Sequence, residues 1–383
     1  MKMRIIISFF IIVFPWQFSA GQSKKESSTQ PAVVINKDSI KNTLKKVADW
    51  QIKNFTYSTN QSHDFGIDSW TNATLYFGML QWAKIAPDSI AYYDWLTKLG
   101  AENQWKIAEN FINYPKYGLY HADELCIAQT YLGLYKKFRK EEMLKSVQKR
   151  IDWIINYPPN GNMSHTNKQT WTWSDALFMA PPVFAELYTL TGNLRYIEFM
   201  DEQFKKTYNH LYDPKEKLFY RDDSYFNKQE KNGAKVFWGR GNGWVAAGLV
   251  DLLKILPKGS QYRLFYQNLF KELVPRLASL QDKNGFWHAS LLDPTSYPAP
   301  ETSATSLITY ALAYGINEGL LDKEKFKPVV RKAWRALASA VDENGKLGWV
   351  QPIGADPKKV TKEMTSVYGV GAFLLAGTEL YQF

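Results

Sequence analysis

The chain has 383 residues, a formal net charge of +10, 45% hydrophobic and 15% aromatic residues, and one cysteine, Cys126. This composition provides a large apolar core and excludes disorder over most of the chain, and a single cysteine excludes an internal disulfide. No arginine-rich helix or aromatic RNA-binding signature accompanies the basic charge, so nucleic acid is not expected as a partner. A basic protein of this kind favours polyanionic ligands such as acidic or sulfated glycans.

Residues 1–21 have the pattern of a secretory signal peptide. Lys2 and Arg4 precede an apolar run at 5–14, and the small residues Ala20 and Gly21 follow it. The run is too short for a stable membrane anchor, and removing its two charges leaves a net charge of +8 (10 minus 2). We therefore predict an exported protein, periplasmic or secreted, that is not inserted in a membrane after cleavage and is a monomer or weak dimer.

After a polar, flexible lead-in at 22–37, residues 38–383 read as one helical domain. Six segments open on polar or aromatic residues and continue as runs rich in Ala, Gly, Leu and aromatics. These predicted inner helices open at 69–71, 121–123, 173–175, 240–244, 301–303 and 365–367. Six amphipathic helices are predicted between them, at 39–55, 87–103, 141–156, 193–210, 261–281 and 322–341.

A helix that is apolar all round must be buried, whereas an amphipathic helix lies outside the buried ones. Alternation of six inner with six outer helices is the pattern of an all-α (α/α)6 barrel. The inner helices of such a barrel run in the same direction, so their N-terminal ends gather at one end. We expect the active-site mouth there.

A glycine-rich stretch at 235–244, with Trp238, Arg240 and Trp244, precedes an apolar helical run. Glycines allow close approach of backbone, indole faces stack on sugar rings, and a guanidinium fits a carboxylate. The stretch therefore predicts a loop at a helix start that holds an acidic sugar. A tight turn with core tryptophans explains the same residues.

Two aspartates stand at the openings of predicted inner helices. Asp175 is preceded by two indoles, Trp171 and Trp173, and a carboxyl group walled by aromatic rings has a raised pKa, as a general acid needs. Asp123 has the matching place one inner helix earlier, so the two carboxyl groups would converge. Helix capping is the alternative for both residues.

His165 and Lys168 lie on the segment before Asp175 and could contact a substrate carboxylate or hydroxyl, although solvated loop residues look the same. The five histidines include no pair at the helical spacing of zinc ligands, so no metal is expected. No nucleotide-binding fingerprint is present, so no cofactor is expected.

Several stretches together resemble glycoside hydrolase family 105, the unsaturated rhamnogalacturonyl hydrolases, and the related unsaturated glucuronyl hydrolases of family 88. The resemblance extends from about residue 125 onward and implies the (α/α)6 barrel. The stretches that carry it are WSDALFMAPP at 173–182, WGRGNGW at 238–244, ETSAT at 301–305, LGWVQP at 347–352 and YGVGAFLLAG at 368–377.

The resemblance also implies a reaction. Such enzymes remove a 4,5-unsaturated uronic acid, left by polysaccharide lyases, from the non-reducing end of an oligosaccharide by hydrating its C4=C5 bond. It implies proton transfer by Asp175 and positioning of sugar and water by Asp123. Substrate contacts are implied for Arg240 and Trp244, with the pocket lined further by His165, Trp173 and Trp238.

One residue departs from the family pattern. A histidine is expected after the Leu-Phe-Tyr at 218–220, but this chain has Arg221. An additional arginine could suit a sulfated aglycone, as in ulvan fragments, in place of a rhamnogalacturonan fragment; a surface arginine is the alternative. Other functions on the same fold remain open, namely a conventional acid/base glycosidase, a sugar epimerase or a non-catalytic glycan-binding protein.

Overall fold

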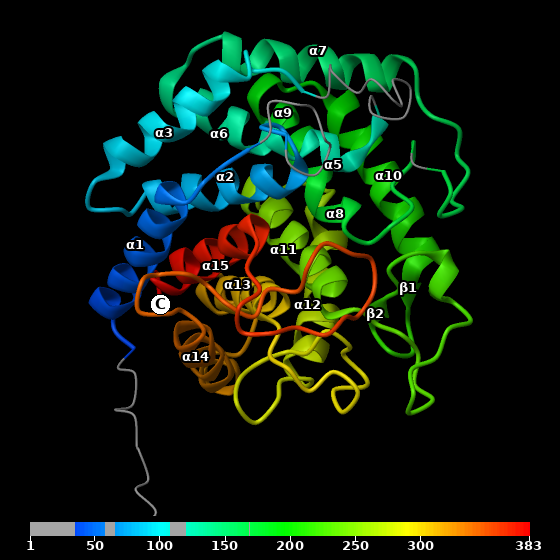
Figure 1. Cartoon of the computed structure of the whole chain (residues 1–383). Coiled ribbons are helices and arrows are strands. Elements are labelled where there is room, and N and C mark those ends of the chain that lie inside the picture. Colours follow the sequence, from blue (N-terminus) through cyan, green and yellow to red (C-terminus); the bar gives the residue numbers. More distant parts are fainter. Residues whose placement is uncertain (1–34, 58–65, 108–119, 168) are drawn as a thin grey trace, which may run out of the picture. The chain divides into compact units, whose positions relative to one another are not determined.

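The computed structural model describes residues 35–57, 66–107, 120–167 and 169–383. Six inner helices form a closed ring, in which each helix contacts the next and the last contacts the first (Figure 1). In ring order they are α2 (Trp70–Ala83), α6 (Ile127–Phe138), α9 (Pro181–Thr191), α11 (Gly239–Ile255), α13 (Thr302–Asn317) and α15 (Val367–Leu380).

Each inner helix is covered by one outer helix. The pairs are α3 on α2, α7 on α6, α10 on α9, α12 on α11, α14 on α13 and α1 on α15. The outer helices are α1 (Lys37–Lys53), α3 (Ser89–Glu102), α7 (Glu142–Asn156), α10 (Leu194–Leu211), α12 (Arg263–Ala278) and α14 (Lys323–Ser339). The predicted (α/α)6 barrel is confirmed, with the predicted inner and outer segments in their predicted layers.

Side-chain patterning explains the two layers. Every residue of α13 from Thr302 to Ile316 is buried, because its polar positions are small Ser and Thr that pack inside the ring. On α14, Phe326, Val330 and Trp334 recur at four-residue spacing and form one buried stripe. The remaining surface of that helix faces solvent.

Two inner helices begin with a separate short helix. α5 (Ala122–Leu125) precedes α6, and α8 (Ala176–Met179) precedes α9. The second break lies at Ala180, directly before Pro181 and Pro182. Proline has no backbone N–H to continue the earlier helix but suits the first turn of a new one.

The prediction of a loop at 238–244 is wrong in one respect. Trp238 is the N-cap of α11, and the glycines lie in the first turns of the helix itself. A side chain at Gly239 would clash with the carbonyl oxygen of His288, and one at Gly243 would crowd Leu307 at 3.0 Å. The glycines are therefore needed for close packing around this helix end.

Regular strand among the described residues is limited to a short hairpin, in which β1 (Tyr212–Asp213) pairs antiparallel with β2 (Leu218–Phe219). A 3₁₀ turn, η1 (Asp223–Tyr225), follows it. Residues 35–383 form one compact unit, and no described helix is long and apolar enough to cross a membrane. The predicted signal peptide and most of the predicted lead-in lie outside the described residues.

The ring closes where α2 and α15 approach most closely, at Gly78 and Gly371. A methyl group on Gly371 would clash with the backbone carbonyl of Thr74. We expect Gly371→Ala to lower the free energy of unfolding by about 1–3 kcal/mol, because backbone cannot move aside as a flexible side chain can. Gly161→Ala, where no atom lies within 4 Å, is the control and should be near neutral in urea unfolding. Equal stability of the two variants would contradict this account of ring closure.

Candidate active site

The N-terminal ends of the inner helices meet, as predicted. The ring of Trp70, at the start of α2, lies 5.1 Å from that of Tyr368 at the start of α15. Arg240 of α11 donates a hydrogen bond to the Tyr368 hydroxyl at 3.1 Å. A side chain at Gly241 would lie 3.0 Å from Oγ of Ser174, before α8. Four of the six predicted openings are thus joined by direct contact.

Asp175 stands immediately before α8, but its carboxylate does not cap the helix. Its Oδ2 accepts a hydrogen bond from Oγ of Ser174 at 3.0 Å. Burial raises the pKa of Asp175 above its usual range, although the charges of Arg221 and Arg240 and the Ser174 hydrogen bond oppose the shift. The capping explanation therefore does not account for this side chain, and its environment favours a carboxyl group that holds a proton.

Arg221 lies beside Asp175 rather than on an open surface. Its carbonyl oxygen accepts from the N–H of Ser174 at 2.9 Å, and its Nη1 bonds the carboxylate of Asp222. Burial opposes its charge, yet Asp175, Asp222 and Asp123 together raise the pKa of the guanidinium. Its Nε is buried without a hydrogen-bond partner among the described residues. The explanation of Arg221 as a surface residue is wrong.

Asp123 belongs to α5, where the ring of His121 caps the helix by accepting from the Asp123 N–H at 3.3 Å. The Asp123 carboxylate lies 3.9 Å from His121 Nδ1, and its charge acts on Arg221. The His121 ring stacks on Trp173 with centroids 4.6 Å apart. This stack joins the openings of α5 and α8, and the charges of Asp123 and Asp175 both act on Arg221. Convergence of the two carboxyl groups on one substrate stays a prediction.

Arg240 is placed differently from the prediction. Its Nη1 donates to the carbonyl of Gln351 at 2.8 Å and its Nη2 to that of Pro352 at 3.1 Å. The guanidinium lies between the rings of Trp238 and Tyr368, at 4.4 and 4.9 Å, and the residue is 1% exposed. Arg240 thus anchors the loop between α14 and α15 (orange to red in Figure 1) and does not offer an open fork to a substrate carboxylate.

The three predicted tryptophans are also buried. Trp244 is 0% exposed and packs against Phe178 at 4.8 Å, so neither indole face is open to a sugar ring. Trp238 donates its indole N–H to Gln351 and, like Trp173, is almost fully covered. Trp70 is only partly buried, which makes it the better stacking candidate at the mouth. Sequence reasoning placed Trp70 at a helix opening but gave it no role.

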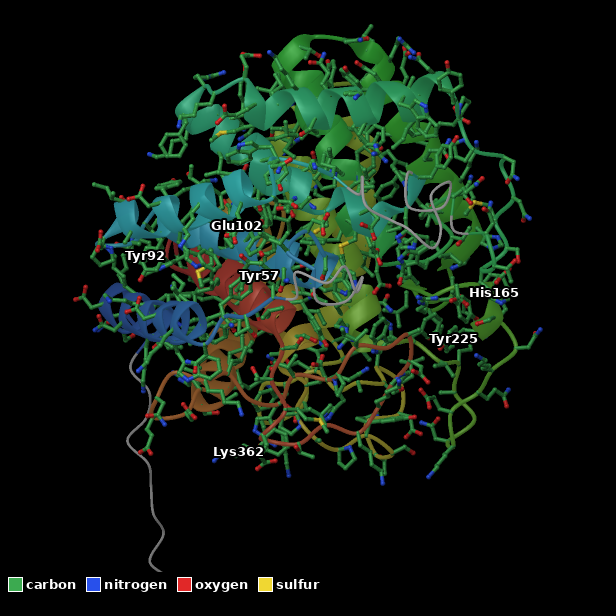
Figure 2. The ribbon with its side chains drawn as sticks, turned by 45° about the horizontal axis from the view of Figure 1, so that its top comes forward. Tyr57, Tyr92, Glu102, His165, Tyr225 and Lys362 are labelled. Carbon is green, nitrogen blue, oxygen red and sulfur yellow. The ribbon has the colours of Figure 1, made fainter. Side chains whose placement is uncertain are left out.

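His165 lies next to the Arg221 segment. Its Nδ1 is 2.6 Å from Oδ1 of Asp223. In Figure 2, His165 and Tyr225 lie on the same side of the barrel. No contact with Asp175 is seen, so a substrate role for His165 stays a prediction. Lys168 lies outside the described residues.

Ligand atoms of His165, Asp222 and Asp223 lie within 4.8 Å of one another, which is the spacing of a possible metal site. However, these carboxylates already have partners. Oδ1 of Asp222 accepts from Ser224, its Oδ2 is bonded to Arg221, and Oδ1 of Asp223 is bonded to His165. Each of the three residues is thus already bonded within the protein, and we assign them no ion.

Sequence reasoning missed two residues that follow Arg221. Asp222 is 2% exposed and holds the arginine in place. Tyr225 is buried, and burial together with the charges of Asp356, Asp222 and Asp175 raises the pKa of its hydroxyl to about 12. The run of polar and charged residues at 221–225 could have indicated both residues, but only Arg221 was singled out from it.

Comparison with known proteins gives a family for this fold and site. Residues 43–383 match the description "Glycosyl Hydrolase Family 88". Two relatives named "Unsaturated 3S-rhamnoglycuronyl hydrolase" are similar along nearly their whole length. The one from Alteromonas sp. is 32% identical (93% of this chain, 91% of the relative), and the one from Formosa agariphila is 35% identical (90% and 91%).

Solved structures agree on the fold. A family 88 glycosyl hydrolase from Bacteroides vulgatus has a TM-score of 0.80 at 29% identity, covering 91% of this chain and 99% of that one. A protein named as a polysaccharide lyase also has a TM-score of 0.80, at 32% identity, covering 90% and 97%. The family match spans most of the chain, and relatives above 30% identity cover nine tenths of it; the chain therefore belongs to glycosyl hydrolase family 88 and is a glycoside hydrolase.

Proposed function

We propose that this enzyme removes a 4,5-unsaturated uronic acid from the non-reducing end of lyase-generated oligosaccharides. The observation that carries the proposal is Asp175, a carboxyl group with a raised pKa that caps no helix and lies beside the charge of Arg221. The names of the two curated relatives, both unsaturated 3S-rhamnoglycuronyl hydrolases, support the same substrate class.

In the proposed reaction, protonated Asp175 gives its proton to C4 of the double bond, and water adds its hydroxyl at C5. The carboxylate of Asp175 takes up the remaining proton of the water, which regenerates the acid. The resulting hemiketal at C5 opens to a ketone, C1 releases the next sugar as an alcohol, and C1 becomes an aldehyde. Asp123, whose charge acts on the same arginine, positions the sugar and the water.

Arg221 takes the carboxylate-binding role in this proposal. Both amino groups of Arg240 are bonded to loop carbonyls and the residue is only 1% exposed, whereas the side chain of Arg221 is 20% exposed and can reach a ligand at the mouth. An anionic sugar at this position would meet the guanidinium at the side of Asp175. Trp70, partly exposed at the start of α2, offers the neighbouring aromatic face.

For the second sugar, we propose rhamnose, and sulfated rhamnose in preference to the unsulfated rhamnose of rhamnogalacturonan. The support is the printed name of the relatives, which specifies 3S-rhamnoglycuronyl compounds, together with the basic charge of the chain. We also propose export to the periplasm or medium, on the pattern of residues 1–21.

A lyase is the second candidate, because one similar structure is named a polysaccharide lyase. A lyase forms the unsaturated uronate by elimination, whereas the proposed hydrolase consumes it. Incubation with intact polysaccharides and with their lyase digests separates the two. A fall in ultraviolet absorbance on a digest of ulvan, rhamnogalacturonan or glycosaminoglycan supports the hydrolase and identifies its substrate, and a rise on an intact polymer supports the lyase.

Asp175→Asn should lower kcat on the responsive digest by roughly 10²–10⁴-fold, since an amide cannot transfer the proton. Binding of the oligosaccharide, measured by calorimetry, should be largely retained because the amide has the size of the carboxyl group. Asp94→Asn, at an exposed position on α3, is the matched control and should keep full activity. A fully active Asp175→Asn enzyme would show that another group transfers the proton.

Arg221→Gln should have two separate effects. Loss of the positive charge should raise KM for the anionic substrate by about tenfold or more. It should also raise the pKa of Asp175 further, because the charge of Arg221 opposes the shift caused by burial. Activity requires protonated Asp175 and is lost as pH rises through its pKa, so the alkaline limb of kcat/KM should move to higher pH.

Arg335→Gln, at an exposed position on α14, is the control for loss of one positive charge. It should change neither KM nor the pH profile. If Arg221→Gln behaves like this control, Arg221 neither binds the substrate nor acts on the acid.

A further inference from the structure

A cavity of about 480 Å³ lies at the opposite end of the barrel from the mouth. It is lined by the ends of inner helices, including Lys84 at the C-cap of α2, Lys136 and Lys137 in the last turn of α6, and Lys254 in the last turn of α11. Neither carboxylate of the active site lines it, and Arg221 does not line it either. Its volume is within the range of sites for small molecules.

The four lysines are not all neutralised by carboxylates. Lys136 pairs with Glu186 at 2.9 Å, and Lys254 pairs with Glu379. The ammonium group of Lys84 donates to the neutral Gln81 side chain at 2.6 Å, and that of Lys137 lies over the ring of Tyr93 at 4.3 Å. Lysines at helix C-terminal ends offset the partial negative charge of the carbonyls there, which accounts for their position but not for the cavity between them.

Two buried acceptor atoms belong to residues that line the same cavity. Within the described part of the chain, Oδ2 of Asp251 and Oε1 of Gln129 have no hydrogen-bond partner, although these residues are only 3% and 6% exposed. The other polar atoms of these side chains are bonded, Asp251 Oδ1 to the Tyr310 hydroxyl and Gln129 Nε2 to the carbonyl of Phe178. Buried polar atoms nearly always have partners, so two such acceptors at one cavity point to a ligand that carries hydroxyl groups.

The remaining walls include apolar surface, from Phe77, Leu80 and Ile255. Cationic groups near the opening, acceptors deeper in the wall and apolar faces between them match the chemistry of a sugar with one acidic group. A simple inorganic anion would use the lysines but would leave the two acceptors unsatisfied.

We propose that this cavity is a second ligand site, which binds a monosaccharide or disaccharide that carries one carboxylate. Lys84 and Lys137 bind the carboxylate, and Asp251 and Gln129 accept from sugar hydroxyls. The site shares no residue with the active site, so the proposal holds whether or not the proposed reaction is correct.

The test is calorimetric titration of the full chain with sodium D-glucuronate, with D-glucose and sodium sulfate as the uncharged and hydroxyl-free probes. Four proteins are compared: the unchanged chain, the double variant Lys84→Gln/Lys137→Gln, the active-site variant Arg221→Gln, and a charge control. Both lysines are exposed, so the double variant should fold. Lys98→Gln/Lys145→Gln, at exposed positions on outer helices, controls for the loss of two charges.

We expect glucuronate to bind the unchanged chain, the control and Arg221→Gln with similar affinity, and the Lys84/Lys137 variant at least about tenfold more weakly. Glucose and sulfate should each bind more weakly than glucuronate. Absence of glucuronate binding, or binding that depends on Arg221 and not on the two lysines, would overturn the proposal. Sulfate that binds as tightly as glucuronate would also overturn it, since the site would then be a simple anion site.

The pH dependence gives an independent readout. Surrounding protein removes water from the Lys84 ammonium group, and the charges of Lys254 and Lys136 repel it. Together these effects lower the pKa of Lys84 to about 8, while the charges of Asp251 and Glu186 act in the opposite direction. Lys84 is charged below that pKa, and Asp251, whose pKa burial raises to about 7, becomes negatively charged over the same interval. Both changes weaken binding of a carboxylate, so glucuronate affinity at this site should fall between pH 7 and pH 9, and by less in the Lys84→Gln/Lys137→Gln variant. The guanidinium of Arg221 stays charged over this range, so undiminished affinity at pH 9 would contradict the role of Lys84.

Discussion

The mouth of the barrel depends on one buried cation, the guanidinium of Arg240. It is held between two aromatic rings and donates to carbonyl groups of the loop that follows α14. A buried charge is tolerated only when hydrogen bonds and polarisable neighbours replace its hydration, and this site supplies both. Through Arg240, the first turn of α11, the loop and the start of α15 are fixed to one another, which sets the wall of the site.

This arrangement divides two tasks between two arginines. Arg240 has both amino groups bonded to backbone carbonyls and contributes a fixed positive field, whereas Arg221 is partly exposed and interacts with the charges of both Asp123 and Asp175. The acid is therefore held between opposing influences, because burial favours its protonated form and the two cations favour its charged form. Small changes in either cation shift that balance, which is how a fixed scaffold can tune proton transfer.

The fold could be predicted because the two helix layers differ in composition along their whole length. Asp175 and Asp123 could be placed from their positions at helix openings. The roles of Arg240 and Trp244 could not, since an arginine that binds loop carbonyls and an indole in a core have the same local sequence as their substrate-binding counterparts. The far-end cavity was not anticipated either, because its lysines come from three helices and look like ordinary basic residues at helix ends.

The contact between Gly78 and Gly371 has a consequence for how the chain folds. These residues are about 290 positions apart in the sequence, yet their helices must lie backbone to backbone for the ring to close. Contacts of such separation form late, since the entropy of closing a long loop is lost before the contact contributes any stability. An open ring would expose the apolar flanks of α2 and α15, which are buried nearly throughout in the closed form. Aggregation during folding should therefore begin at this seam, and a partner that shields either helix until the ring closes would raise the yield of native enzyme.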